Sequence, residues 1–183
     1  MIKDLWNVPN VISLIRLALI PVFIWLVIEA NYGAGAILLG VIGATDWIDG
    51  YFARRLGQVT EVGKFLDPLA DRIAVAVAVI AGLFTGVLPF WFAILLILRE
   101  VMIGIGALIG WRNGVTKLEV RYLGKVATLL LYFSVSFFYG YAGFDLEIFL
   151  WAAWGTGIPG LVSYYWVAFQ YLGDMKNAIA DAK

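Results

Sequence analysis

The stretch from Asp46 to Asp71 constrains this chain most, because it places four aspartates and an Arg-Arg pair in a sequence that is 63% hydrophobic. If its segments are helical, Asp46 and Asp49 share one helix face, and Asp67 and Asp71 share another. Two such helices facing each other would bring the four carboxylates together. An ionised side chain in a bilayer costs about 2.5–3.5 kcal/mol on insertion scales, so we expect divalent cations to compensate this charge.

The composition identifies an integral membrane protein. A mean hydropathy of +0.91 with only 14% charged residues lies outside the range of soluble domains, and 183 residues predict one domain spanning 1–183. The 13 basic and 13 acidic residues cancel, which argues against a nucleic-acid partner. Without Cys or His, thiol and imidazole chemistry are excluded, and proton transfer must fall to Asp, Glu, Lys or Tyr.

Long apolar runs predict an all-α bundle of six transmembrane helices, preceded by a short N-terminal interfacial helix at residues 1–6. Pro9 and Asn10 are expected to form the entry turn and cap of the first span. We expect turns at 31–33, 86–89 and 140–147, and a polar tail after residue 172. The predicted spans are 11–28, 34–56, 61–84, 90–111, 120–139 and 148–172.

The basic residues predict the orientation of this bundle. With the N-terminus inside, most of them fall on or near the cytoplasmic face, whereas the three predicted outer turns contain no Lys or Arg and carry Glu29, Asp145 and Glu147. We therefore expect a multi-pass protein of the cell (inner) membrane, with both termini and the aspartate cluster facing the cytoplasm. The basic residues on that side are Lys3, Arg54, Arg55, Lys64, Arg112, Lys117, Arg121, Lys176 and Lys183.

Carboxylate oxygens suit hard cations such as Mg²⁺, Mn²⁺ or Ca²⁺. Four converging aspartates can bridge two ions, an arrangement that polarises a phosphoryl group and neutralises the attacking and leaving oxygens. Gly50 and Gly63 would let a phosphate-bearing group approach the backbone, and Arg54 could grip a phosphate. The alternative is that the aspartates only pair with nearby cations at the membrane surface, namely Arg54, Arg55, Lys64 and Arg72.

The joint spacing of these residues favours the metal site. It reads D-x2-D-G-x2-A-R-x8-G-x3-D-x3-D and resembles the signature of the CDP-alcohol phosphatidyltransferases. An N-x2-[ST] pattern at Asn10 and Ser13 and a Gly124-Lys125 pair extend the resemblance over essentially the whole chain. The signature positions are Asp46, Asp49, Gly50, Ala53, Arg54, Gly63, Asp67 and Asp71.

The resemblance implies transfer of a phosphatidyl group from CDP-diacylglycerol to an alcohol, with release of CMP, by a homodimer. It implies that Asp46, Asp49, Asp67 and Asp71 ligate two Mg²⁺ or Mn²⁺ ions, and that Asp71 also acts as the base. The residues implied to bind CDP-diacylglycerol are Asn10, Ser13, Asp49, Gly50, Ala53, Arg54, Thr60 and Gly63.

The acceptor alcohol is indicated less directly. Arg99, Arg121 and Lys125 are the candidates for binding it, although Arg99 and Glu100 could instead form a buried structural pair. Family members that use glycerol 3-phosphate typically carry GKxKT, whereas this chain has Ala127 in place of the second Lys. A site with one cation fewer suits an acceptor that carries a phosphodiester better than one that carries a phosphate dianion.

The motif at 111–114 and the Tyr-Tyr-Trp at 164–166 are similar to actinobacterial members assigned as cardiolipin synthases. We therefore expect phosphatidylglycerol as the acceptor, giving cardiolipin. Glycerol 3-phosphate is the second expectation and an inositol phosphate the third. A small ion-coupled transporter and a structural membrane scaffold are the alternatives outside enzymes.

Overall fold

The computed structural model describes residues 8–43, 61–112 and 122–181, and within these ranges all regular secondary structure is helical. A helix without a label, Tyr32–Gly43, lies between α2 and the next described segment. The all-α prediction is therefore confirmed for the part of the chain that the structure describes. The labelled helices are α2 (Val8–Ile28), α4 (Glu61–Thr85), α5 (Phe90–Arg112), α6 (Tyr122–Phe144) and α7 (Glu147–Asp181).

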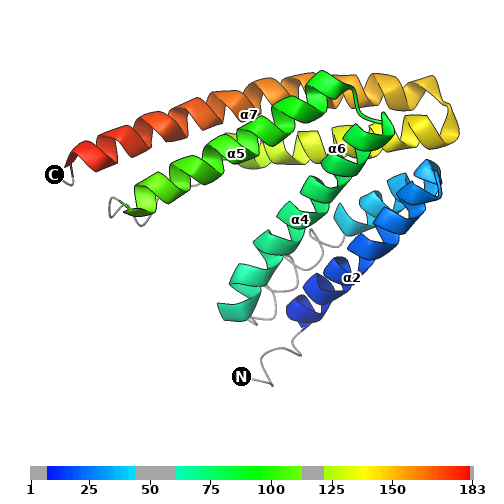
Figure 1. Ribbon diagram of the computed structural model, residues 1–183, viewed down its shortest axis with the longest axis horizontal. Coiled ribbons are helices and arrows are strands. Elements are labelled where there is room, and N and C mark those ends of the chain that lie inside the picture. Colours follow the sequence, from blue (N-terminus) through cyan, green and yellow to red (C-terminus); the bar gives the residue numbers. More distant parts are fainter. Residues whose placement is uncertain (1–7, 44–60, 113–121, 182–183) are drawn as a thin grey trace.

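The helices meet at one end of the bundle and spread apart toward the other (Figure 1). Short turns at 29–31, 86–89 and 145–146 join successive helices at one end, which we call the turn end. At the opposite end α2, α4 and α6 begin and α5 and α7 finish, and we call it the polar end because the charged residues described below lie toward it. Helices α2 and α4 pack side by side and run parallel, while α6 packs along α7.

Local chemistry explains the turns. Asn31 caps the helix at Tyr32–Gly43, because its Oδ1 accepts a hydrogen bond from the backbone N–H of Ala34 at 3.3 Å. Gly86 adopts a positive φ of 74° in the turn before α5, a conformation that glycine enters without a steric penalty. The predicted turn at 86–89 is thus confirmed, and the first turn lies slightly earlier than predicted.

Two of the predicted helix ends are wrong. Helix α6 does not stop at residue 139 but continues through Gly140 and Gly143 to Phe144. These glycines serve close packing, since a Cβ on Gly140 would lie 2.9 Å from the ring of Phe149, and one on Gly143 would overlap the backbone of Gly33. Helix α7 continues beyond the predicted end at residue 172, so the polar tail is helical to Asp181, and Pro159 lies in the helix interior.

The predicted start of the first span is wrong by three residues. Helix α2 begins at Val8, so Pro9 and Asn10 belong to its first turn and do not form an entry turn before it. Proline is tolerated there because the first backbone N–H groups of a helix have no partner within the helix.

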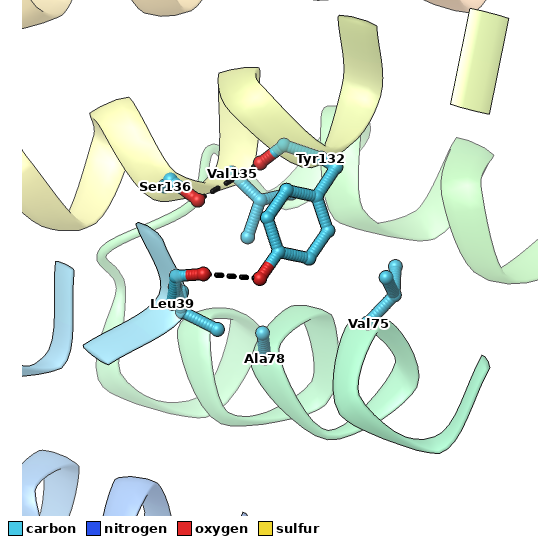
Figure 2. A pocket seen from close by; sticks show the side chains of 6 residues that line it. All are labelled: Leu39, Val75, Ala78, Tyr132, Val135 and Ser136. Carbon is cyan, nitrogen blue, oxygen red and sulfur yellow. Dashed lines mark hydrogen bonds between the residues drawn. The ribbon is translucent and has the colours of Figure 1, made fainter. Parts of the chain in front are cut away.

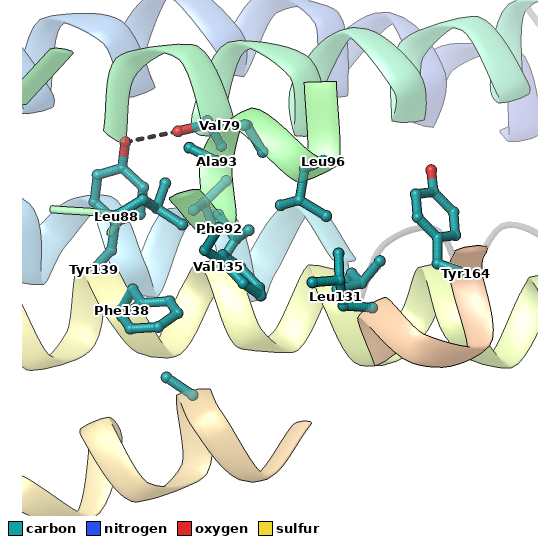
Figure 3. Packing of buried hydrophobic residues seen from close by; sticks show 14 of the residues in the cluster. Val79, Leu88, Phe92, Ala93, Leu96, Leu131, Val135, Phe138, Tyr139 and Tyr164 are labelled. Atoms are coloured by element: carbon teal, nitrogen blue, oxygen red, sulfur yellow. Dashed lines mark hydrogen bonds between the residues drawn. The ribbon is translucent and has the colours of Figure 1, made fainter. Parts of the chain in front are cut away.

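Aromatic and aliphatic side chains from the helices interlock toward the turn end (Figure 3). Tyr139 exposes none of its surface, packs edge-on against Phe23 with ring centroids 5.2 Å apart, and donates a hydrogen bond to the carbonyl of Ala78 at 2.9 Å. Ser134 donates to the carbonyl of Ala153 at 2.8 Å, which joins α6 to α7. These buried polar groups are satisfied, as a low-dielectric interior requires.

The outward surface of the bundle is strongly apolar. Large side chains such as Phe84, Phe90 and Trp151 expose 85%, 72% and 72% of their surface near the turn end, whereas the charged side chains of Arg16 and Arg99 are buried. Soluble proteins show the opposite distribution, with apolar side chains buried and charged ones exposed. The distribution seen here is typical of a protein surrounded by lipid. Within the described residues, α6 is the one helix that is long and apolar enough by itself to cross a membrane, and three shorter apolar helices accompany it.

Candidate functional site

The signature aspartates fall partly within the described structure. Asp67 and Asp71 occupy α4, and their spacing on a continuous helix places both positions on one face, as predicted. Asn10 and Ser13 lie in the first half of α2, and Gly63 lies in the first turn of α4. The predicted residues outside the described ranges are Asp46, Asp49, Gly50, Ala53, Arg54, Thr60 and Arg121.

The convergence of four carboxylates therefore stays a prediction. Among the side chains that the structure describes, no group of three or more potential metal ligands gathers. The donor set itself remains consistent with a hard cation, since every member is a carboxylate and the chain lacks Cys and His.

Arg16 is a buried charge that the sequence analysis did not select. It exposes none of its surface and belongs to the inward face of α2 that continues with Ile20 and Phe23. Ile20 clusters with Ala74 of α4. Helices α2 and α4 run parallel, so residues one turn before this contact lie at the same level in both helices. Those residues are Arg16 in α2 and Asp71 in α4.

The position of Arg16 could have been noticed in the sequence. It follows Ser13 by three residues and interrupts an apolar run. A cation in a lipid-embedded helix is costly and usually serves a function, so Arg16 joins the candidate site as a positive charge at the level of the aspartates.

Arg99 lies in α5 and is held by residues of two helices. Its Nη1 donates a hydrogen bond to Oε1 of Glu100 at 2.9 Å, and its guanidinium carbon lies 3.3 Å from the ring centroid of Tyr164 in α7. The hydroxyl of Tyr164 donates to the same carboxylate oxygen. The structural pairing of Arg99 with Glu100, one of the two interpretations of this residue, is thus present.

A second cation lies near Arg99. Arg72 directly follows Asp71 in α4, and its charge is close enough to act on the Arg99 guanidinium. Two like charges repel at such range, and a bound anion would relieve this repulsion. The arrangement therefore suits a phosphate group beside the end of α4 that carries the aspartates.

The first turns of α6 carry Lys125 and Ala127. The side chain of Lys125 is exposed, whereas Ala127 exposes none of its surface. One residue before Lys125, a Cβ on Gly124 would lie 3.3 Å from Val167 of α7, which shows how closely these helices approach. Ala127 belongs to the hydrophobic core, so a small apolar residue at this position suits the packing independently of any acceptor.

Figure 2 shows the pocket beneath Tyr132, which is a packing feature and not a ligand site. Its walls come from Leu39, Val75, Ala78 and Val135, and Tyr132 reaches across it to donate a hydrogen bond to the carbonyl of Leu39. The space that remains does not admit a water molecule.

The sequence profile of the CDP-alcohol phosphatidyltransferases matches residues 6–159, a range that contains the aspartate signature together with Asn10, Ser13, Arg99 and Lys125. The chain belongs to this family. It is therefore a transferase, and the predicted resemblance is confirmed. The transporter and scaffold alternatives are set aside by the same match.

Several curated relatives align with most of the chain. A cardiolipin synthase (CMP-forming) of Streptomyces coelicolor is 29% identical over 186 residues, covering 94% of this chain and 84% of the relative. A Mycobacterium tuberculosis protein provisionally named a cardiolipin synthase is 35% identical over 183 residues, with the same coverage. A CDP-diacylglycerol–glycerol-3-phosphate 3-phosphatidyltransferase of Bacillus subtilis is 36% identical over 148 residues, covering 72% of this chain and 76% of the relative.

Proposed function

We propose that this CDP-alcohol phosphatidyltransferase transfers the phosphatidyl group of CDP-diacylglycerol to phosphatidylglycerol, forming cardiolipin and CMP. The observation that carries this choice is the extent of the similarity. The relatives named as cardiolipin synthases align with 94% of the chain, whereas the Bacillus subtilis glycerol-3-phosphate enzyme aligns with 72%. Phosphatidylglycerophosphate synthesis from glycerol 3-phosphate is the alternative, and its support is the slightly higher identity of 36% within that shorter range.

The transfer exchanges a phosphoanhydride bond for a phosphoester bond. A hydroxyl oxygen of the acceptor forms a bond to the phosphorus that carries the diacylglycerol, and the bond from that phosphorus to the oxygen of CMP breaks. The acceptor hydroxyl proton passes to the carboxylate of Asp71, which we assign as the base because the chain has no His. Positioning and neutralisation of charge supply most of the catalysis in such reactions.

Asp46, Asp49, Asp67 and Asp71 would hold two Mg²⁺ or Mn²⁺ ions. The helical register of Asp67 and Asp71 supports this assignment, because it puts both positions on one face of α4. The bound ions would supply neutralisation of the two phosphates and of the leaving oxygen.

The nucleotide end of CDP-diacylglycerol would be held by residues from α2, from α4 and from the segment before α4. We add Arg16 to them, and the support is that it is a buried positive charge one turn before Ile20, which packs against Ala74 of α4. The proposed set is Asn10, Ser13, Arg16, Asp49, Gly50, Ala53, Arg54, Thr60 and Gly63.

Arg99, Arg121 and Lys125 would bind the phosphate of the acceptor. The support for Arg99 is its buried guanidinium beside the charge of Arg72. The support for Lys125 is its exposed position at the polar end, where α6 begins.

We further propose the membrane topology and assembly. Residues 1–183 would form one domain with six membrane-spanning helices and an N-terminal interfacial helix, working as a homodimer. The polar end would face the cytoplasm at the inner membrane, which agrees with the positive-inside distribution of the basic residues. The exposed aromatic side chains at the turn end would lie at the outer membrane interface.

An acceptor panel tests the proposal. Purified full-length protein in mixed micelles should release CMP from CDP-diacylglycerol when phosphatidylglycerol is supplied, and the lipid product should be cardiolipin by mass spectrometry. EDTA should abolish release, and either Mg²⁺ or Mn²⁺ should restore it. Turnover with glycerol 3-phosphate and not with phosphatidylglycerol would establish the alternative, and an absence of CMP with every acceptor, inositol phosphate included, would refute both.

A further inference from the structure

The cluster of Arg99, Glu100 and Tyr164 connects α5 to α7 toward the polar end. Figure 3 shows Tyr164 at the end of the row of packed side chains, beyond Leu96 and Leu131. The ring of Tyr164 covers one face of the Arg99 guanidinium at 3.3 Å, and its hydroxyl shares the Glu100 carboxylate oxygen with Nη1 of Arg99. Each of the three side chains therefore restricts the orientation of the other two.

The guanidinium has a buried donor that finds no acceptor within this cluster. The side chain of Arg99 is only 9% exposed, and its Nε is buried with no hydrogen-bond acceptor in the described structure. A buried donor left without an acceptor is unfavourable, and the penalty is greater for a charged group. Because a phosphate or carboxylate grips a guanidinium along one edge by two parallel hydrogen bonds, an unused edge suits an anionic ligand.

The surroundings favour an anion. Arg72, next to Asp71 in sequence, is within electrostatic range of Arg99. Glu100 neutralises one of these two cations, but its carboxylate is already committed to Nη1 and to the Tyr164 hydroxyl. Among the described residues, Glu100 is the carboxylate that pairs with Arg99, and the charge of Arg72 adds to the positive potential at this guanidinium, near the helix that carries the proposed base.

We propose that Tyr164 is a positioning residue of the acceptor site: it holds the Arg99 guanidinium so that the Nε edge is presented to the phosphate of the acceptor alcohol. This inference rests on the proposed function. Stacking on the ring prevents the guanidinium from tilting, and the hydroxyl keeps Glu100 in place along the opposite edge. Without Tyr164 the Arg99 side chain would retain its charge but lose its fixed direction.

Neighbouring Tyr165 provides a matched control. Its hydroxyl donates to the carbonyl of Leu95 at 2.8 Å, so it also joins α7 to α5. It forms neither the hydrogen bond nor the ring contact of the Arg99 guanidinium, which belong to Glu100 and Tyr164, although the charge of Arg99 acts on it electrostatically. A purely structural role for these tyrosines would make Tyr164→Phe and Tyr165→Phe behave alike.

The test measures the rate of CMP release while the concentration of the acceptor or of CDP-diacylglycerol is varied. One series uses phosphatidylglycerol as the acceptor and a second uses glycerol 3-phosphate. Tyr164→Leu should raise the KM for the productive acceptor about tenfold, the scale of a desolvated cation–π contact. Tyr164→Phe, which keeps the ring, should raise it about threefold, the scale of one weak hydrogen bond. The KM for CDP-diacylglycerol should not change in either variant, and Tyr165→Phe should change neither constant.

The outcomes separate the inference from the proposed function. An unchanged acceptor KM in both Tyr164 variants would overturn the inference, and so would equal shifts in the KM values of both substrates. If Tyr164→Leu does not fold, Tyr164→Phe compared with Tyr165→Phe carries the test alone. Wild-type protein that releases no CMP with any acceptor would refute the proposed function, whereas active wild-type protein with the unchanged constants described above would refute the inference only.

Discussion

The two ends of the bundle differ in what they bury. At the turn end, short connections join the helices, and the interior holds satisfied groups such as the hydroxyl of Tyr139 and the close backbone contact between Gly33 and Gly143. Toward the polar end, the interior holds the cations Arg16 and Arg99, and the latter keeps an unused donor. The turn end therefore buries groups whose hydrogen bonds are complete, whereas the polar end buries positively charged side chains, which suit a negatively charged substrate.

The largest expected effect comes from removing the proposed base. Asp71→Asn should lower kcat by about 10²–10⁴-fold, the range expected for loss of a general base, while CDP-diacylglycerol still binds. Asp145→Asn is the matched control at the turn end, where asparagine tolerates the positive φ of 53°. CMP release should fall only in the first variant, and comparable activity in both would contradict the assignment of the base.

Next in size is a steric substitution at the turn end. Gly143→Ala would place a methyl group against the backbone of Gly33, which cannot rotate away as a side chain can. We expect a loss of about 1–3 kcal/mol in unfolding free energy, as for overpacking elsewhere. Gly155→Ala, where no atom lies within 4 Å of the added carbon, should cause no loss, and thermal unfolding in detergent compares the two.

A smaller effect is expected from a buried hydroxyl. Tyr139→Phe removes the hydrogen bond to the Ala78 carbonyl and should destabilise the fold by about 1 kcal/mol. Activity at permissive temperature should stay unchanged, because Tyr139 lies toward the turn end. A selective fall in kcat at full folding would show that the two ends are more strongly coupled than the packing indicates.

The smallest effect should come from an exposed cation. Lys125→Ala should raise the KM for the acceptor about threefold at low salt, since exposed charges contribute little and are screened. Lys125→Arg keeps the charge and should behave like the wild type. A raised KM that persists at high salt would indicate a direct, desolvated contact in place of long-range attraction.

The sequence allowed much of the fold to be predicted. The start of α4 at Glu61 and of α5 at Phe90 agree with prediction, and at α5 the reason is that Gly86 and Pro89 mark the turn before it. The end of α6 was missed because a glycine in an apolar run can either break a helix or allow close packing. Contact with Phe149 decides this at Gly140, and it joins residues of different helices.

The candidate site could be predicted only in part from the sequence. Aspartate spacing and the family resemblance were sufficient to identify the family, because motif residues lie within a few turns of one another. Arg16 and Tyr164 were not selected as site residues, since lipid-facing and inward-facing positions are both apolar and periodicity does not distinguish them. Only the packing of α2 on α4 and of α7 on α5 reveals which residues face inward.

Pro159 gives α7 a mechanical property. Because proline has no N–H, the carbonyl of Gly155 has no hydrogen-bond donor within the helix. Helix α7 is therefore least stiff at this point. Residues on both sides of Pro159 pack against α6: Ala153 before it accepts the hydrogen bond of Ser134, and Val167 beyond it lies close to Gly124. Contact with a neighbouring helix therefore holds α7 in place where its own backbone hydrogen bonding is interrupted.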